Sequence, residues 1–158
     1  MLIRSRLIAV ILAVGVAISL APYTIAGAST SRHAAARQYL SDIAPYTSAT
    51  SVFAKDANSW GNSTTVSTMG KEAAPVIAAL RGMQRDFLKQ KWPKNTRADI
   101  RALYSSIGPV IGDFESISSL TPGTLSTWEG QVSRDGAITA SASNLVRSDL
   151  GLPTTATS

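Results

Sequence analysis

The chain contains no cysteine and only one histidine, and each shortage excludes a class of protein. Without cysteine there is no disulfide framework, no thiolate metal ligand and no lipid attachment site of the lipoprotein kind. The single histidine, His33, cannot by itself supply a positioned base or a metal site with several ligands. We therefore expect a protein that is not an enzyme, binds no metal or cofactor, and is held together by packing alone.

Phosphate-binding and di-iron motifs are also missing. There is no Gly-x-Gly-x-x-Gly loop, no Walker loop and no Glu-x-x-His pair. Asp113 and Glu115 are two residues apart, so they point to different helix faces and would need a long-range partner to act as catalytic carboxylates. Aromatic residues do not alternate with basic ones as base-stacking surfaces require, so we expect no nucleic-acid partner.

The first residues have the pattern of a secretory signal peptide. Arg4 and Arg6 precede an apolar run over residues 7–20, and Ala26 and Ala28 supply small residues at a cleavage site after Ala28. The run would span about 21 Å as a helix, short of the roughly 30 Å hydrocarbon core. We predict a signal peptide over 1–28 and an exported protein, secreted or associated with the cell envelope. An uncleaved N-terminal anchor is the alternative.

What the sequence does contain is apolar residues spaced alternately by three and four, which line one side of an α-helix. This spacing occurs in three stretches, and a fourth resembles them except that Asp135 interrupts it. The positions are Tyr39, Ile43, Tyr46, Thr50, Phe53, Ala57 and Trp60; Val66, Met69, Ala73, Val76, Leu80, Met83 and Phe87; Ile100, Leu103, Ile107, Val110, Phe114 and Ile117; and Leu125, Trp128, Val132, Asp135, Thr139, Ala142 and Val146.

Short polar links separate these stretches, so neighbouring helices must run antiparallel. We predict an all-α, up-down-up-down antiparallel four-helix bundle over residues 29–153, followed by a disordered tail over 154–158. The predicted helices cover 32–59, 66–91, 97–119 and 122–150. Thr96 and Thr121 are the expected N-caps of the last two helices. Gly61 and Gly151 are the expected left-handed C-terminal residues.

Pro45, Pro75 and Pro109 lie inside the first three helices, and the apolar spacing continues past each, so we expect kinks. Counted along an up-down bundle, these prolines and Gly136 share one level, about 20 Å from the end where the first helix begins. One interpretation is ordinary tolerance of proline. The other is a bent waist with a small cavity, in which the carbonyls of Ser41, Lys71 and Ser105 need new partners.

Asp135 occupies a position on the core stripe of the fourth helix. If its carboxylate is buried it needs hydrogen-bond donors, because an unpaired buried charge costs several kcal/mol. Tyr46 stands at nearly the same level, so Asp135 and Tyr46 form a candidate mid-bundle polar site. In the alternative, the helix is rotated and Asp135 meets water or a surface arginine.

Basic residues are concentrated in one part of the sequence. Between Lys71 and Arg101 there are eight basic residues against three acidic ones, within a chain of formal net charge +5. This concentration is either a solvated face or a docking surface for an anionic partner, such as an acidic envelope polymer or lipid headgroups. The candidate anion-docking residues are Arg81, Arg85, Lys89, Lys91, Lys94, Arg97 and Arg101.

Several short motifs resemble those of a group of small exported helical proteins and lipoproteins from high-GC Gram-positive bacteria. The resemblance covers about the last two thirds of the mature chain and implies an exported, all-α protein, although the cysteine of the lipoproteins is missing here. No activity is implied by it. The motifs are Trp92-Pro93, residues 97–103, Gly112-Asp113, Trp128 and residues 146–153.

Together these observations predict an exported, non-enzymatic helical bundle that acts by binding, at the cell envelope. A carrier of a small molecule or lipid, with a cavity at the mid-bundle level, is the second hypothesis. A hydrolase with long-range carboxylates is the third.

Overall fold

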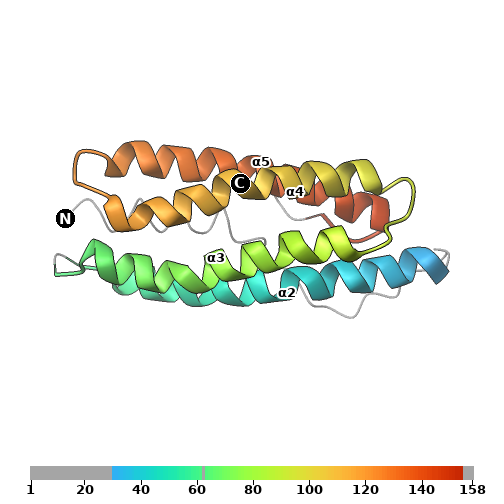
Figure 1. Ribbon diagram of the computed structural model, residues 1–158, viewed down its shortest axis with the longest axis horizontal. Coiled ribbons are helices and arrows are strands. Elements are labelled where there is room, and N and C mark those ends of the chain that lie inside the picture. The colour runs from blue at the N-terminus through green and yellow to red at the C-terminus, as the bar shows by residue number, and fades with distance from the viewer. Residues whose placement is uncertain (1–29, 62, 155–158) are drawn as a thin grey trace.

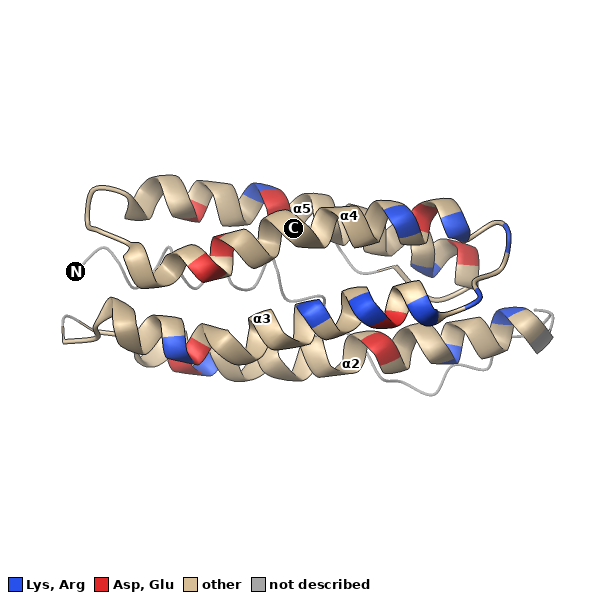
Figure 2. Cartoon of the chain, viewed as in Figure 1, with Lys and Arg blue, Asp and Glu red and all other residues tan. Residues whose placement is uncertain are grey.

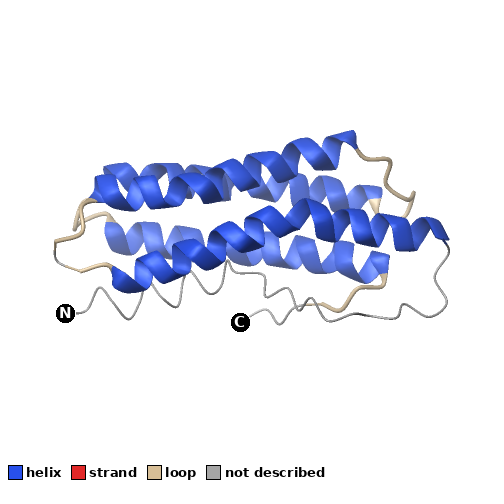
Figure 3. Ribbon diagram, turned by 90° about the horizontal axis from the view of Figure 1, so that it is seen from below, coloured by secondary structure: helices blue, strands red, loops and turns tan. Residues whose placement is uncertain are grey.

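The computed structural model describes residues 30–61 and 63–154, and within them it consists of helices and connecting turns without a strand (Figure 3). The predicted signal peptide, 1–28, and tail residues 155–158 lie outside the described residues. The all-α four-helix bundle is confirmed. Its elements are α2 (Thr30–Ser59), α3 (Val66–Lys89), α4 (Arg97–Ser116), the 3₁₀ helix η1 (Ile117–Ser119) and α5 (Leu125–Leu150).

The four helices run up, down, up and down along one axis, as the short links predict (Figure 1). Figures 1 and 3 show two layers, one formed by α2 and α3 and the other by α4 and α5. Contacts join α2 to α3, α3 to α4 and α4 to α5, and α5 returns to α2 through the smallest of these interfaces. The bundle is therefore two antiparallel hairpins packed on each other.

The predicted stripes meet at the centre of the bundle. Leu80, Ile107 and Val146 are completely buried, and each occupies a stripe position on a different helix. Two positions of the α3 stripe differ from the prediction: Val66 is 37% exposed and Met69 is half-buried, because both lie in the first turn of α3 at the end of the bundle. Burial of large apolar side chains, at about 25 cal/mol per Å², is the main stabilising term.

The predicted start of α4 at Arg97, with Thr96 at the N-cap position, is confirmed, whereas the capping bond of Thr96 and the start of α5 need correction. Thr96 makes no side-chain capping bond; its hydroxyl is buried, and its carbonyl accepts the Ile100 N–H at 2.9 Å. The last helix begins at Leu125, not Pro122, because the hydroxyl of Thr124 accepts the Thr121 N–H at 2.9 Å and closes a separate turn. The third helix, predicted to reach Ser119, is α-helical only to Ser116 and continues to Ser119 as η1. The second helix, α3, ends at Lys89 and not at Lys91.

One of the two predicted glycine stops is confirmed. Gly151 has φ 72°, its N–H donates to Ser148, and the Leu152 N–H donates to Arg147 at 2.8 Å, which is a Schellman ending. The prediction of a left-handed conformation at Gly61 was wrong, since Gly151 alone has a positive φ among the described glycines. At that end of α2, the Gly61 N–H donates instead to the Thr64 hydroxyl at 2.9 Å.

The three internal prolines lie within continuous helices, as predicted, and all three rings are exposed. Near Pro109, carbonyl groups of α4 bond to both neighbouring helices: Thr139 Oγ1 donates to Ser106 at 3.1 Å, and Gln84 Nε2 donates to Tyr104 at 3.1 Å. These carbonyls flank Ser105, whose bond the proline removes. Side chains of α3 and α5 thus hold α4 in place at this weak point.

Candidate binding surfaces

All seven basic residues singled out from the sequence are exposed, and the fold brings them together where α3 is joined to α4. Figure 2 shows Lys and Arg concentrated over this end of α3, the link and the start of α4. We call this surface the basic corner. It consists of Arg81, Arg85 and Lys89 on α3, Lys91 and Lys94 in the link, and Arg97 and Arg101 on α4.

A buried tryptophan fixes the link that carries two of these lysines. Trp92 is 6% exposed, stacks edge-on against Phe87 and donates its indole N–H to the Phe87 carbonyl at 2.8 Å. The Arg97 side chain then donates to the carbonyl of Trp92 at 3.0 Å. Because the link is anchored at its centre, Lys91 and Lys94 project from a defined position and not from a mobile loop.

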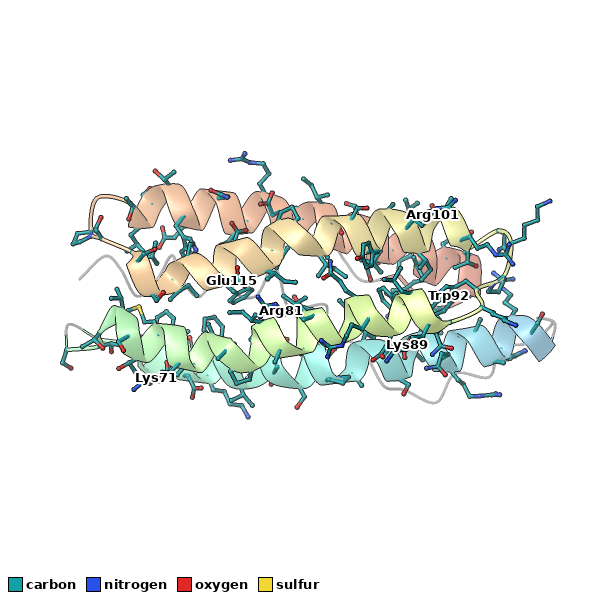
Figure 4. All side chains as sticks on the ribbon, in the orientation of Figure 1. Lys71, Arg81, Lys89, Trp92, Arg101 and Glu115 are labelled. Carbon is teal, nitrogen blue, oxygen red and sulfur yellow. The ribbon has the colours of Figure 1, made fainter. Side chains whose placement is uncertain are left out.

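Most charges of the basic corner are not neutralised within the described part of the chain. Arg81 forms an ion pair with Glu115 across α3 and α4 (Figure 4), and Lys89 contacts Asp86 at 3.2 Å. Both pairs are solvent-exposed, so each contributes little to stability. Four residues make no hydrogen bond or ion pair to the described residues: Arg85, Lys91, Lys94 and Arg101. The positive charge is available to a partner.

An exposed leucine lies within the basic corner and was missed by the sequence analysis. Leu88 is 69% exposed, the highest value among the large apolar residues in the described ranges, and it stands between Arg85 and Lys89 on α3. The sequence does hold the signal: Leu88 follows the stripe position Phe87 directly, so it must point away from the core. An exposed apolar side chain with cations on the same helix is a feature of amphipathic helices that bind lipid surfaces.

A small cavity lies in the waist of the bundle, between α2 and the other helices. Its volume is about 20 Å³, and Tyr39, Tyr46, Thr139 and Ser143 are among its lining residues. A cavity needs about 10–15 Å³ to hold one water, whereas pockets for small molecules measure about 300–1,000 Å³. In the described conformation this cavity has room for a water molecule and not for a lipid or metabolite.

The two residues of the predicted mid-bundle site face different surroundings. Tyr46 is 4% exposed at the cavity, where burial raises the pKa of its phenol. Asp135 is half-buried on the side of α5 that faces α4, where it meets Asp113. Across the interface of α2 with α5, the hydroxyl of Tyr39 lies 2.7 Å from Ser143 Oγ.

Carboxyl groups of neighbouring helices face each other at three places, which sequence reasoning left open. Asp113 is 2% exposed, and its pKa is raised to about 6 by burial and by the neighbouring Asp135 carboxyl. Burial and Asp99 raise the pKa of Asp149, and burial also raises that of Asp42, with Asp86 adding to it. Because the pairs lie on separate helices, their formation depends on how the helices are aligned.

A wider groove of about 460 Å³ lies on the surface between α3 and the end of α4. Phe114 and Ile77 contribute its apolar part, and Lys71 and Glu115 its charged part. Gly70 allows the close approach of α3 to η1 here, since a Cβ at this position would lie 3.1 Å from the Ser118 Cβ. One cation and one carboxylate do not form a convergent polar set, so the groove supports no particular ligand.

The described residues contain neither a cluster of metal ligands nor a candidate membrane-spanning helix. No group of three or more His, Cys, Asp or Glu side chains there is placed to hold a metal ion, and His33 is half-buried in the first turn of α2. Within the same residues, each helix is too short or too polar to cross a bilayer. No family model, curated protein or solved structure matches this chain. The basic corner is therefore the feature from which a function has to be argued.

Proposed function

We propose that this protein is exported and acts at the cell envelope by docking on an anionic surface through its basic corner. The observation that carries the proposal is the group of four exposed, unneutralised cations (Arg85, Lys91, Lys94 and Arg101) at one end of the bundle, in a chain of formal net charge +5. Each basic residue near an anionic lipid surface contributes about 1 kcal/mol. The apolar run and small-residue site at the N-terminus support export.

Leu88 favours lipid headgroups over an acidic polymer as the anionic partner. A polymer is bound by charge alone, whereas a bilayer surface also accepts an apolar side chain at the headgroup boundary. The 69% exposure of Leu88 between Arg85 and Lys89 fits the second case. The protein would therefore rest on the membrane by its α3–α4 end, with the bundle axis pointing away from the surface.

Charge reversal with a matched control tests this proposal. The variant Lys91→Glu/Lys94→Glu changes the formal net charge of the chain from +5 to +1. The control Lys55→Glu/Lys71→Glu changes it equally, at the end of the bundle where α2 is joined to α3. Figure 4 shows how far Lys71 lies from Lys89 and Arg101. Removing two contacts of about 1 kcal/mol lowers affinity for anionic vesicles about 30-fold. The control should bind like the parent.

Two further measurements identify the partner. Leu88→Ser should weaken binding to anionic vesicles and leave binding to an acidic polymer unchanged. Equal loss of vesicle binding in both charge variants would show that net charge alone is responsible, and would contradict docking by the basic corner.

A further inference from the structure

A second stripe runs along the side of α5 next to α4, and it shares Asp135 and the buried Ala142 with the core stripe. Its five residues are spaced by three and four, so they lie on one side of the helix. Ile138 and Leu145 are 54% and 55% exposed in its middle, and an aspartate stands at each end. We call Asp135, Ile138, Ala142, Leu145 and Asp149 the α5 outer stripe. Its aspartates are fourteen residues apart, or about 21 Å along the helix.

The acidic ends of this stripe carry unsatisfied negative charge. Asp135 faces Asp113, and Asp149 faces Asp99, both across the α4–α5 interface. Asp113 is 2% exposed, and its Oδ2 has no hydrogen-bond partner; Asp149 Oδ2 is likewise buried and unpartnered. One arginine approaches each pair, Arg134 at the first and Arg32 at the second, so two carboxyl groups face one cation. Each end therefore keeps an excess of negative charge, which the half-buried Asp135 and Asp149 bring toward the surface.

A complementary stripe is present on the outer side of α3. Lys71 and Arg85 are fourteen residues apart, and neither forms a hydrogen bond or ion pair with the described residues. The side chains between them are small: Pro75 and Ala78 are exposed, and Gly82 is half-buried. We call Lys71, Pro75, Ala78, Gly82 and Arg85 the α3 outer stripe. It has cations where the α5 outer stripe has acids, and small residues where that stripe has large ones.

We propose that the α5 outer stripe binds the α3 outer stripe of a second copy of this chain, with the two helices antiparallel. In this alignment Asp135 meets Arg85 and Asp149 meets Lys71. Ile138 then lies over Gly82 and Leu145 over Pro75. The residue spacings in the two stripes are equal. One alignment of the helices therefore forms the two charged contacts and also packs Ile138 and Leu145 against small residues.

Like charges oppose the symmetric alternatives. Two antiparallel α5 outer stripes would place Asp135 against Asp149, and two α3 outer stripes would place Lys71 against Arg85. The contact therefore joins different surfaces on the two copies, and each copy keeps one stripe free. Such a contact adds copies without closing, so a chain or layer of molecules forms. This association is separate from the proposed docking, with which it shares only Arg85.

A mixing experiment with two variants tests this contact. The variant Lys71→Glu/Arg85→Glu disrupts the α3 outer stripe. The variant Asp135→Asn/Ile138→Asn/Leu145→Asn disrupts the α5 outer stripe. Of the five substituted residues, Asp135 is half-buried and the other four are exposed. Circular dichroism checks that both fold. By sedimentation velocity at about 0.01 M salt and up to about 1 mM protein, the parent should form species larger than a dimer. Each variant alone should be monomeric, and their equimolar mixture should form a dimer that grows no further.

Two results would overturn the proposal: a parent that stays monomeric at about 1 mM, or a mixture that contains no dimer. The control Arg37→Glu/Lys55→Glu changes the charge as much as the α3 variant does and should associate like the parent. The α5 variant keeps all seven residues of the basic corner. Its binding to anionic vesicles should therefore be unchanged, so failure of self-association and failure of membrane docking are separate outcomes.

Discussion

The carboxyl group of Asp113 on α4 faces that of Asp135 on α5, in a bundle whose net charge is positive. Asp113 is almost completely buried, one of its oxygens has no hydrogen-bond partner, and its pKa is raised to about 6. Arg134 lowers this pKa but does not offset burial and the second carboxyl group. At neutral pH the interface between α4 and α5 therefore holds an unfavourable negative charge on Asp113. Protonation of this carboxyl group at lower pH would neutralise the charge.

Stability should consequently rise as the pH falls from 7 toward 4. The pKa of Asp113 is higher in the folded state, about 6, than in the unfolded chain, so its contribution is complete below about 3.8 and is lost as the pH rises through 6. Raised pKa values at Asp42 and Asp149 act in the same direction. Urea unfolding at several pH values measures the effect, which for Asp113 is at most about 3 kcal/mol.

Asp113→Asn isolates this contribution. The amide has the same shape without the charge, so the variant should be about 1–3 kcal/mol more stable than the parent at pH 7.5 and should lose most of the pH dependence. Glu115→Gln is the control, because Glu115 is exposed and pairs with Arg81 on the surface. A variant less stable than the parent at pH 7.5 would show that the charged form of Asp113 is favoured after all.

The stripe residues should dominate the free energy of unfolding. Leu80 and Ile107 are completely buried, so Leu80→Ala and Ile107→Ala should each cost about 2–5 kcal/mol through lost burial and a cavity. Lys94→Ala removes an exposed side chain and should change stability by less than about 0.5 kcal/mol. Chemical denaturation measures the free energy of unfolding of the three variants. Equal losses would mean that the stripe positions are not the buried ones.

The smallest of the four helix interfaces, α2 with α5, should depend strongly on one buried hydrogen bond. Tyr39 and Ser143 join α2 to α5 at 2.7 Å, and both are buried. Tyr39→Phe leaves the serine hydroxyl buried without this partner and should cost about 1–3 kcal/mol. Ser143→Ala in the Tyr39→Phe background should cost less than it does alone, since the bond is already absent. Additive costs in this double-mutant cycle would mean that the bond contributes nothing.

The sequence predicted the bundle because its main determinants are local. Alternating spacings of three and four identify the buried side of each helix, and links of a few residues leave only antiparallel neighbours. The basic corner was predictable for the same reason: Arg81, Arg85 and Lys89 repeat every four residues, and the link adds the next lysines. Gly151 was predictable because an apolar residue and a proline follow it.

Features that depend on the alignment of two helices were not predictable. Asp113 meets Asp135, and Asp99 meets Asp149, only because α4 and α5 pack antiparallel in one register, which no spacing within either helix determines. Tertiary packing also overrode local preference at Thr96, where burial of the side chain replaced the expected capping bond.

Sedimentation of the parent protein with phosphatidylglycerol-containing vesicles tests most directly whether the basic corner docks on an anionic surface. Binding should be strong at about 0.01 M salt and should weaken toward about 0.15 M, as the screening length falls from about 30 Å to about 8 Å. Vesicles of phosphatidylcholine alone should bind little at either salt concentration. A protein that does not sediment with the anionic vesicles even at about 0.01 M salt would contradict the claim and leave the basic corner as a solvated face.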